Sequence, residues 1–414
     1  MTRNLLLTLF IILVSLTIGY GQRFRSINDK HPFARANVTY QDDFGFIWFG
    51  TREGLIKYDG YSTTEYKKKP GVPTSLPGTQ VKSILQVSDS ILFIGFDRFG
   101  LGQFNRNNGN SRIIHLKEDL DNLHVNSMIK DHTGSIWVGT NDGLYKLDGY
   151  SWNKVSKVYS EREGLVSRNV LELYQDDIKN LWIGTDMGIH RLLDGKEIIE
   201  NPMTNPGFPK EEVINIQEDN DGDLWVSFRQ GSCKLYKWDP RKKEFSKDRR
   251  FIRDGEFSFT FDENNNIWAS SHGRGVYHFK EDEEILYSDK DYSWHGLRAM
   301  FTYSVFHDKY HNTWVESDEV FKMPGSNKEF YSIESDKFQV ISVYADDDNI
   351  WYCSNEPHRW SRREKQSDAY LENVDFTELI NPDRERKHKR IYKYDEWGDW
   401  VVFTSIRNIY IWDR

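Results

Sequence analysis

The sequence predicts an all-β fold, a β-propeller whose blades each contain four strands. A motif of the form Asp-x-x-Gly-x-(Ile/Leu)-Trp-x-Gly-Thr-x-x-Gly-(Leu/Ile)-x-x-x-Asp, clearest at Asp131–Asp148, recurs along the chain. Within each clear copy the turn residues keep fixed places. Aromatic residues make up 15% of the 414 residues, and 29 are glycine. These three observations favour short strands joined by tight turns.

Nine copies of the motif divide the chain at intervals of about 40–50 residues, the period of a radial β-repeat. Two further copies, at Asp42–Asp59 and Asp176–Asp194, keep nearly all of the pattern, and the others are weaker. The copies are anchored at Trp48, Phe93, Trp137, Trp182, Trp225, Trp268, Trp314, Trp351 and Val402, with steps of 45, 44, 45, 43, 43, 46, 37 and 51 residues.

Each part of a repeat predicts one element. Asp131 to Gly134 supplies a tight turn, because Asp side chains bond neighbouring backbone amides and Gly accepts a positive φ. The strand Ile136–Thr140 follows, and Asn141 to Gly143 signals a second hairpin. We expect the recurring Trp to pack between adjacent blades. The expected inner strands include Ala36–Tyr40, Val81–Gln86, Val170–Gln175 and Val213–Gln217, and the expected outer strands include Tyr61–Tyr66 and Trp152–Val158.

The two ends of the repeat region are complementary. Arg23–Ile27 has the place of a fourth strand without the three before it, and the last repeat ends on a third strand at Asn408–Asp413. Pairing these ends would remove an open sheet edge. We therefore expect residues 22–414 to form a single closed ring of nine blades. Because nine exceeds the usual four to eight blades, seven blades plus an incomplete second propeller remains the alternative.

Residues 1–21 are predicted to be a signal peptide. Arg3 gives a positive start, Leu5–Ile18 is an apolar run, and Gly19-Tyr20-Gly21 has small residues where a signal peptidase reads. The run is too short for a comfortable membrane span, and none is expected after it. The expected location is therefore exported, either periplasmic or extracellular.

The net charge argues against broad nucleic-acid binding, and the positions of the cysteines argue against a disulfide bond. The 55 basic and 64 acidic side chains give a net charge of −9, which argues against broad nucleic-acid binding. The two cysteines, Cys233 and Cys353, lie three repeats apart. In a propeller that separation is beyond bridging reach, so we expect two separate thiols and no disulfide.

The units at Asp42–Gly60, Asp131–Gly149 and Asp176–Gly195 resemble the two-component regulator propeller repeat, as does the connector Glu163–Val170. The resemblance implies an extracytoplasmic sensor region, followed in that family by a small Ig-like domain, a membrane span and a histidine kinase or another cytoplasmic output. It also implies glycan fragments as common inputs. This chain departs from the pattern, since it shows no second membrane segment, kinase motif or receiver aspartate. We expect it to be the sensing part, with a signalling partner or a missing C-terminal kinase.

Ligands of propellers usually meet the face formed by the hairpins between second and third strands, near the central channel. On that face the candidate ligand-binding residues are Arg52, Arg98, Asn141, Asp186, Arg229, His272, Arg274, Glu356 and Arg407. Five of them are arginines in an acidic chain. The hypothesis is a locally basic face that binds an anionic oligosaccharide through bidentate guanidinium contacts. The alternative is that these are ordinary polar hairpin tips.

Patterns for chemistry are weak. Asp219–Asp223 has the look of a calcium loop but lacks the closing Glu and coincides with the repeat's turn. His307 and His311 have a zinc-like spacing only on a helix, and here they flank a β-turn. We expect no metal, no cofactor and no catalytic residue, and therefore a binding protein. A carbohydrate-active enzyme on the same scaffold and a protein-interaction platform remain the alternatives.

Overall fold

The structure is a computed structural model that describes residues 23–413 apart from the gaps 29–31, 61, 119–121, 149–153, 197–198, 202–204, 206, 230–233, 249–257, 281–282, 292–294, 326–339, 346–348, 355–359, 365–369, 375–390, 398–399 and 406–408. Beyond residue 339 only the backbone is described. The chain divides into two units, Met1–Glu329 and Phe330–Arg414. The predicted signal peptide and Cys233 lie outside the described residues.

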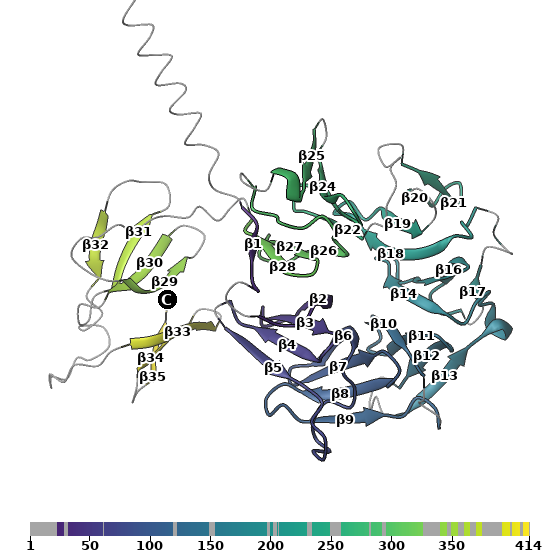
Figure 1. The fold of residues 1–414 in the computed structure, drawn as a ribbon, viewed down its shortest axis with the longest axis horizontal. Coiled ribbons are helices and arrows are strands. Elements are labelled where there is room, and N and C mark those ends of the chain that lie inside the picture. The colour runs from purple at the N-terminus through teal and green to yellow at the C-terminus, as the bar shows by residue number, and fades with distance from the viewer. Residues whose placement is uncertain are drawn as a thin grey trace, which may run out of the picture. The chain divides into compact units, whose positions relative to one another are not determined.

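Unit 1 is built from seven antiparallel four-stranded sheets, the blades of a propeller (Figure 1). Blades 1 to 3 are β2 (Ala36–Gln41), β3 (Ile47–Thr51), β4 (Leu55–Tyr58), β5 (Thr63–Tyr66); β6 (Val81–Ser88), β7 (Ile91–Phe96), β8 (Leu101–Asn105), β9 (Ser111–Ile114); and β10 (Val125–Lys130), β11 (Ile136–Thr140), β12 (Gly143–Leu147), β13 (Val155–Tyr159). Blades 4 and 5 are β14 (Val170–Gln175), β15 (Leu181–Thr185), β16 (Gly188–Leu192), β17 (Ile199–Glu200); and β18 (Glu212–Glu218), β19 (Leu224–Arg229), β20 (Lys234–Asp239), β21 (Glu244–Lys247).

Blades 6 and 7 complete the ring. Blade 6 is β22 (Phe259–Phe261), β23 (Ile267–Ser271), β24 (Gly275–Phe279) and β25 (Glu284–Tyr287); blade 7 is β26 (Ser304–His307), β27 (Thr313–Glu316), β28 (Val320–Met323) and, as its fourth strand, the N-terminal β1 (Arg25–Ser26). Two 3₁₀ turns, η1 (Glu161–Glu163) and η2 (Asp289–Asp291), lie in connectors. Among the described residues, no helix has the length and apolar character needed to cross a membrane.

The expectation of one ring of nine blades is wrong. The N-terminal strand does act as a fourth strand, but it pairs with β28, with Arg25 opposite Lys322 and Ser26 opposite Phe321. That pairing completes the seventh blade, so the eighth and ninth repeats lie outside the ring. The N-terminal strand could complete any blade that lacks a fourth strand. Blade 7 offers such an edge at β28, and β1 pairs there and not with the last repeat of the chain.

Unit 2 contains the remaining two repeats as separate sheets. One is four-stranded, with β29 (Val340–Ala345), β30 (Asn349–Ser354), β31 (Trp360–Glu364) and β32 (Tyr370–Val374); the other is three-stranded, with β33 (Ile391–Trp397), β34 (Trp400–Ser405) and β35 (Ile409–Asp413). The repeats therefore divide into seven within the ring and two outside it.

The recurring aromatic anchor packs between neighbouring blades, as the sequence predicts. Each of seven apolar clusters joins an anchor to the inner strand of the next blade, as Trp182 of blade 4 meets Val213 of blade 5. The clusters lie at Trp48, Phe93, Trp137, Trp182, Trp225, Trp268 and Trp314. The last one, between Trp314 and Ala36, joins blade 7 to blade 1 and closes the ring.

The motif's Asp has a role beyond its turn. In six blades its carboxylate accepts a hydrogen bond from the indole Nε1 of the anchor six residues later, for example at 2.8 Å between Asp176 and Trp182. In blade 2 the same two positions hold Val87 and Phe93. Both members of the pair are thus replaced together, which leaves no buried polar group unpaired.

The glycine two residues after the Trp anchor is required by the close spacing between blades. A Cβ atom on Gly184 would lie 2.5 Å from Cγ1 of Val213 in the next blade, and one on Gly139 would lie 2.7 Å from Cγ1 of Val170. Only glycine admits that approach without displacement. The Thr that follows holds the next hairpin, since the hydroxyl of Thr140 donates to the carbonyl of Gly143 at 2.8 Å.

Candidate ligand-binding face

Seven of the nine candidate residues lie where the repeat places them, at the hairpins between second and third strands. These are Arg52, Arg98, Asn141, Asp186, Arg229, His272 and Arg274. The connectors that lead into each inner strand reach the same ends of the strands, because the first two strands of a blade are antiparallel. Glu356 and Arg407 lie outside the described residues, so the structure does not place them.

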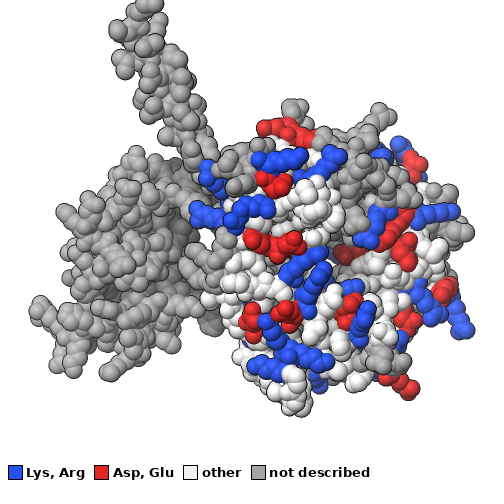
Figure 2. All heavy atoms as spheres, in the orientation of Figure 1, with Lys and Arg blue, Asp and Glu red and all other residues white. Residues whose placement is uncertain are grey.

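Two of the four described arginines of this face, Arg98 and Arg229, have carboxylates as neighbours. Arg229 forms an ion pair with Glu212 at 2.9 Å, and Nε of Arg98 lies 3.9 Å from Asp97. Lys82 also reaches the Asp97 carboxylate, at 3.2 Å. On the face of unit 1 seen in Figure 2, basic and acidic side chains are likewise interspersed. A uniformly basic rim is therefore not what these arginines form.

Asn141 and Asp186 serve the fold as well as the face. The side-chain oxygen of Asn141 accepts the backbone N–H of His124 at 3.0 Å, and its amide donates to the carbonyl of Asn122 at 3.0 Å. Asp186 accepts a hydrogen bond from the side chain of Asn169 at 3.2 Å. Both residues thereby tie a hairpin to the connector that leads into the inner strand of the same blade.

A cluster of one arginine and three ring side chains forms on this face between blades 6, 7 and 1. The guanidinium of Arg35 lies 3.3 Å from the ring centre of Tyr303. The ring of His272 lies 4.9 Å from that of Phe301 and 5.6 Å from that of Tyr303. Their backbones also meet, because His272 and Phe301 form an isolated antiparallel bridge. These four residues are called the arginine–aromatic cluster below.

The Nε atom of Arg35 is buried without a hydrogen-bond partner among the described residues. A buried donor in that state is unusual, because a lost hydrogen bond at a charged group costs about 1.5–3 kcal/mol. The hairpin of Arg52 is adjacent, since its backbone N–H donates to the carbonyl of Arg35 at 3.4 Å. Two of the predicted residues are therefore close to Arg35: His272 within the cluster and Arg52 in the adjacent hairpin. Arg35 itself keeps one N–H donor that no described residue accepts.

Next to the cluster, blade 7 carries a buried carboxyl group. Glu316 occupies the motif position held by Gly139 and Gly184 in other blades and is 1% exposed. One of its oxygens accepts a hydrogen bond from the hydroxyl of Thr39 in blade 1, and the other has no partner among the described residues. Burial raises the pKa of Glu316 to about 7, against the opposing effects of the Thr39 hydrogen bond and the Arg35 charge.

This raised pKa predicts a stability that falls as pH rises. In the unfolded chain the carboxyl titrates near its ordinary value, so its contribution is complete below about pH 4.5 and is lost as pH rises through about 7. We expect Glu316→Gln to unfold like the parent at pH 4 and to be more stable than the parent by up to about 3 kcal/mol at pH 8. Chemical denaturation across this range measures the difference. The exposed Glu53 gives the control, Glu53→Gln, and equal pH profiles for Glu316→Gln and the parent would contradict the prediction.

Sequence reasoning missed Arg35, Tyr303 and Glu316. Glu316 had a visible signal, because it breaks the Trp-x-Gly pattern after Trp314. Arg35 and Tyr303 had none, since both lie just before or at the start of an inner strand, where the repeat has no fixed residue type. Only the closure of the ring brings Arg35 of blade 1 onto Tyr303 of blade 7.

Comparison with known proteins supports the repeat assignment. Residues 119–142, which contain β10 and β11, match the family model described as two component regulator propeller. A comparison with curated protein sequences gives no match.

Among solved structures, the fold is similar to the extracellular domain assigned to the one component system BT4673 from B. thetaiotaomicron, at 19% identity and a TM-score of 0.62 over 94% of this chain and 52% of that chain. It is also similar to the extracellular domain assigned to the hybrid two component system BT3049 from the same organism, at 16% identity and a TM-score of 0.61 over 95% of this chain and 59% of that one. PorZ, a surface component of the type-IX secretion system of Porphyromonas gingivalis, matches at 13% identity and a TM-score of 0.55 over 92% of this chain and 60% of its own.

At these identities the structural similarity shows a shared propeller fold, and the chain spans about half to three fifths of the length of each of the three structures. The family model rests on different information, namely the residues of the repeat itself. The residues of one repeat thus match the two-component regulator propeller model, and the structural matches show that the chain shares its propeller fold with those extracellular domains.

Proposed function

We propose that this chain is an exported sensor module that binds a polar ligand, a glycan fragment with a carboxylate or sulfate group, at the arginine–aromatic cluster. The observation that carries the proposal is the buried Nε of Arg35, which has no hydrogen-bond partner in the described part of the chain, on a guanidinium that stacks on Tyr303. Arg35 is half-buried and its Nε has no access to water, so an anion that binds the guanidinium gains more than one that meets a fully exposed arginine.

The chemistry of the cluster fits an acidic sugar. A guanidinium presents planar donors that match the two oxygens of a carboxylate or sulfate group. Rings offer an apolar surface for the ring faces of a sugar, and a binding site needs such apolar surface with a few placed polar groups. Phe301 is exposed by 41% and His272 is also exposed, so two of the rings are accessible to a ligand.

The proposal is tested by calorimetry with uronate-bearing, sulfated and neutral oligosaccharides. We expect the acidic ligands to bind, and Arg35→Ala to weaken that binding by about 10- to 100-fold, the value of one charge-assisted hydrogen-bonded contact. Tyr303→Leu should also weaken binding, because it removes the aromatic surface under the guanidinium. Arg112→Ala, on the outer strand β9, is the matched control and should bind like the parent.

Three other outcomes distinguish the alternatives. Equal binding of neutral and acidic oligosaccharides, or full binding by Arg35→Ala, would reject the acidic ligand at this cluster. Release of shorter sugars during incubation would favour the carbohydrate-active enzyme. Absence of binding to every oligosaccharide would favour the protein-interaction platform.

The sensing role requires a signalling partner for the bound state. We propose that the module works outside the cytoplasm, in the periplasm or at the cell surface, and passes ligand binding to a membrane-bound output protein. The support is the family repeat and the fold shared with extracellular domains assigned to one and hybrid two component systems. Co-purification of the chain with a membrane protein of that kind, from cells fixed by crosslinking, would test this step.

A further inference from the structure

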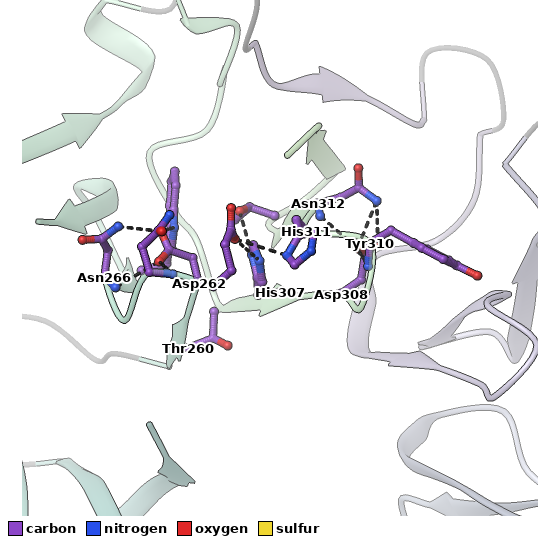
Figure 3. Close-up of polar contacts among 12 residues, drawn as sticks. Thr260, Asp262, Asn266, His307, Asp308, Tyr310, His311 and Asn312 are labelled. Carbon is purple, nitrogen blue, oxygen red and sulfur yellow. Dashed lines mark hydrogen bonds and ion pairs between the residues drawn. The ribbon is translucent and has the colours of Figure 1, made fainter. Parts of the chain in front are cut away.

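At the other ends of the strands, away from the ligand-binding face, two histidines and a glutamate meet between blades 6 and 7. Glu263 lies in the turn between β22 and β23 of blade 6. His307 is the last residue of β26 in blade 7, and His311 lies in the turn that follows it. Figure 3 shows the two histidine rings close to one another, and their centres are 6.1 Å apart.

All three side chains converge on one point. One carboxylate oxygen of Glu263 lies 3.1 Å from Nε2 of His307 and 3.4 Å from Nδ1 of His311. The three ligand atoms lie within 4.8 Å of one another. A tetrahedral zinc ion with bonds of about 2.0–2.1 Å holds its ligand atoms about 3.3 Å apart. The two distances from the Glu263 oxygen bracket that value, and the two histidine nitrogens lie within 4.8 Å of each other.

The junction departs from the way four other pairs of blades are joined. At those four junctions, a side-chain oxygen at the end of an inner strand accepts the backbone N–H of the neighbouring blade's turn. Gln86 does so from Asp43 at 2.9 Å, and Gln175 does so from His132 at 2.8 Å. Between blades 6 and 7 the equivalent position is His307, whose partner is the Glu263 side chain. An imidazole and a carboxylate thus replace a structural amide contact.

His311 is a second departure from the repeat. It occupies the fourth place of the Asp-x-x-Gly turn with φ 62°, where Gly45, Gly134 and Gly222 stand in three other blades and Lys179 and Asn265, also with positive φ, stand in two. A non-glycine residue with this backbone is uncommon, and glycine is the residue that adopts it freely. A histidine is therefore held at a place where glycine would have the least backbone strain.

The surroundings suit a metal ligand set. The Nδ1 atom of His307 lies 3.3 Å from the hydroxyl of Thr313, an outer partner of the kind that orients metal-bound imidazoles. The side chain of His307 is 11% exposed and that of His311 is 43% exposed, so the group is anchored on one side and open on the other. The neighbouring Asp262 is engaged elsewhere, by His278, Asn266 and the Trp268 indole.

We propose that Glu263, His307 and His311 form a zinc site that ties blade 6 to blade 7, with the fourth position open to water or another ligand. Two imidazoles and one carboxylate are the donors that zinc accepts, whereas calcium and magnesium take oxygen ligands. This site was not expected from the sequence. A pair of histidines four residues apart faces one metal ion by itself only on a helix, and the third ligand, Glu263, lies 44 residues before His307. The site is independent of the proposed ligand-binding face.

The test uses the chain without a histidine tag, stripped with a chelator and titrated with Zn²⁺ by calorimetry. We expect one Zn²⁺ per chain and a Tm raised by roughly 5 °C when zinc is about 100 times its Kd. Replacement by Co²⁺ should give the visible bands of a tetrahedral His and carboxylate site. Calcium and magnesium at the same concentrations should leave Tm unchanged.

Variants locate the ion. His311→Gly, which installs the repeat's own turn residue, should fold normally and bind Zn²⁺ more than about 100-fold more weakly, and Thr313→Val should weaken binding by about tenfold. Lys179→Gly makes the same backbone change at the equivalent turn of blade 4, where Lys179 has φ 73°, and should bind like the parent. Absence of Zn²⁺ binding by the parent, or equal binding by His311→Gly, would overturn the proposal.

Discussion

Replacement of Phe24 by alanine is expected to lower the free energy of unfolding by about 3–5 kcal/mol and to promote association of the chain. Phe24 is 3% exposed and meets the rings of Trp268 and Tyr287 edge-on, at 6.3 and 5.4 Å between centres. Its backbone N–H donates to the carbonyl of His295 at 2.7 Å. The residue thus fixes the N-terminal strand onto the core between blades 6 and 7, where β1 covers the edge of β28.

Denaturant unfolding followed by circular dichroism measures the loss, and light scattering follows association. The increase in association is expected because a displaced β1 leaves the edge strand β28 unpaired. Arg25→Ala changes the exposed side chain of the next residue, the first of β1, and serves as the matched control. If Phe24→Ala and Arg25→Ala had equal stability, β1 would not be what closes the ring.

The second prediction concerns the buried pair of Asp176 and Trp182. Trp182 is 1% exposed and its indole donates to the carboxylate at 2.8 Å. We expect Trp182→Phe and Asp176→Val each to lower the free energy of unfolding by about 2–4 kcal/mol, because each leaves part of the pair buried without its partner. The double variant should lose about 1–2 kcal/mol less than the sum of the two.

The reason for that coupling lies in the chain itself. Blade 2 carries Val87 and Phe93 at the equivalent positions, and both are buried in the cluster between blades 2 and 3. A double-mutant cycle by chemical denaturation measures the coupling directly. As a control, Ile178→Val changes a side chain that is 74% exposed in the same turn. Simple additivity in the cycle would mean that the hydrogen bond contributes little and that the packing of Trp182 alone is important.

Much of the blade could be predicted because its determinants are local. The inner strand Val170–Gln175 was predicted with the bounds that β14 has, and the Trp anchors pack between blades as expected. Turn chemistry and strand alternation act within a few residues, so one repeat contains what is needed to specify its own sheet. The hydrogen bond from Trp to Asp was not predicted, although its spacing of six residues was visible in six copies.

The sequence by itself therefore determined the repeat, the four-stranded blade and the end strand that needs a partner. Only the tertiary structure decided that the ring closes after seven blades, because closure depends on the angle and spacing between sheets, which no single repeat encodes. The same closure places Arg35 on Tyr303, and the packing of successive blades places Glu263 beside His307. Each of these contacts joins residues from different blades, and residues so far apart in the chain carry no common pattern before the ring brings them together.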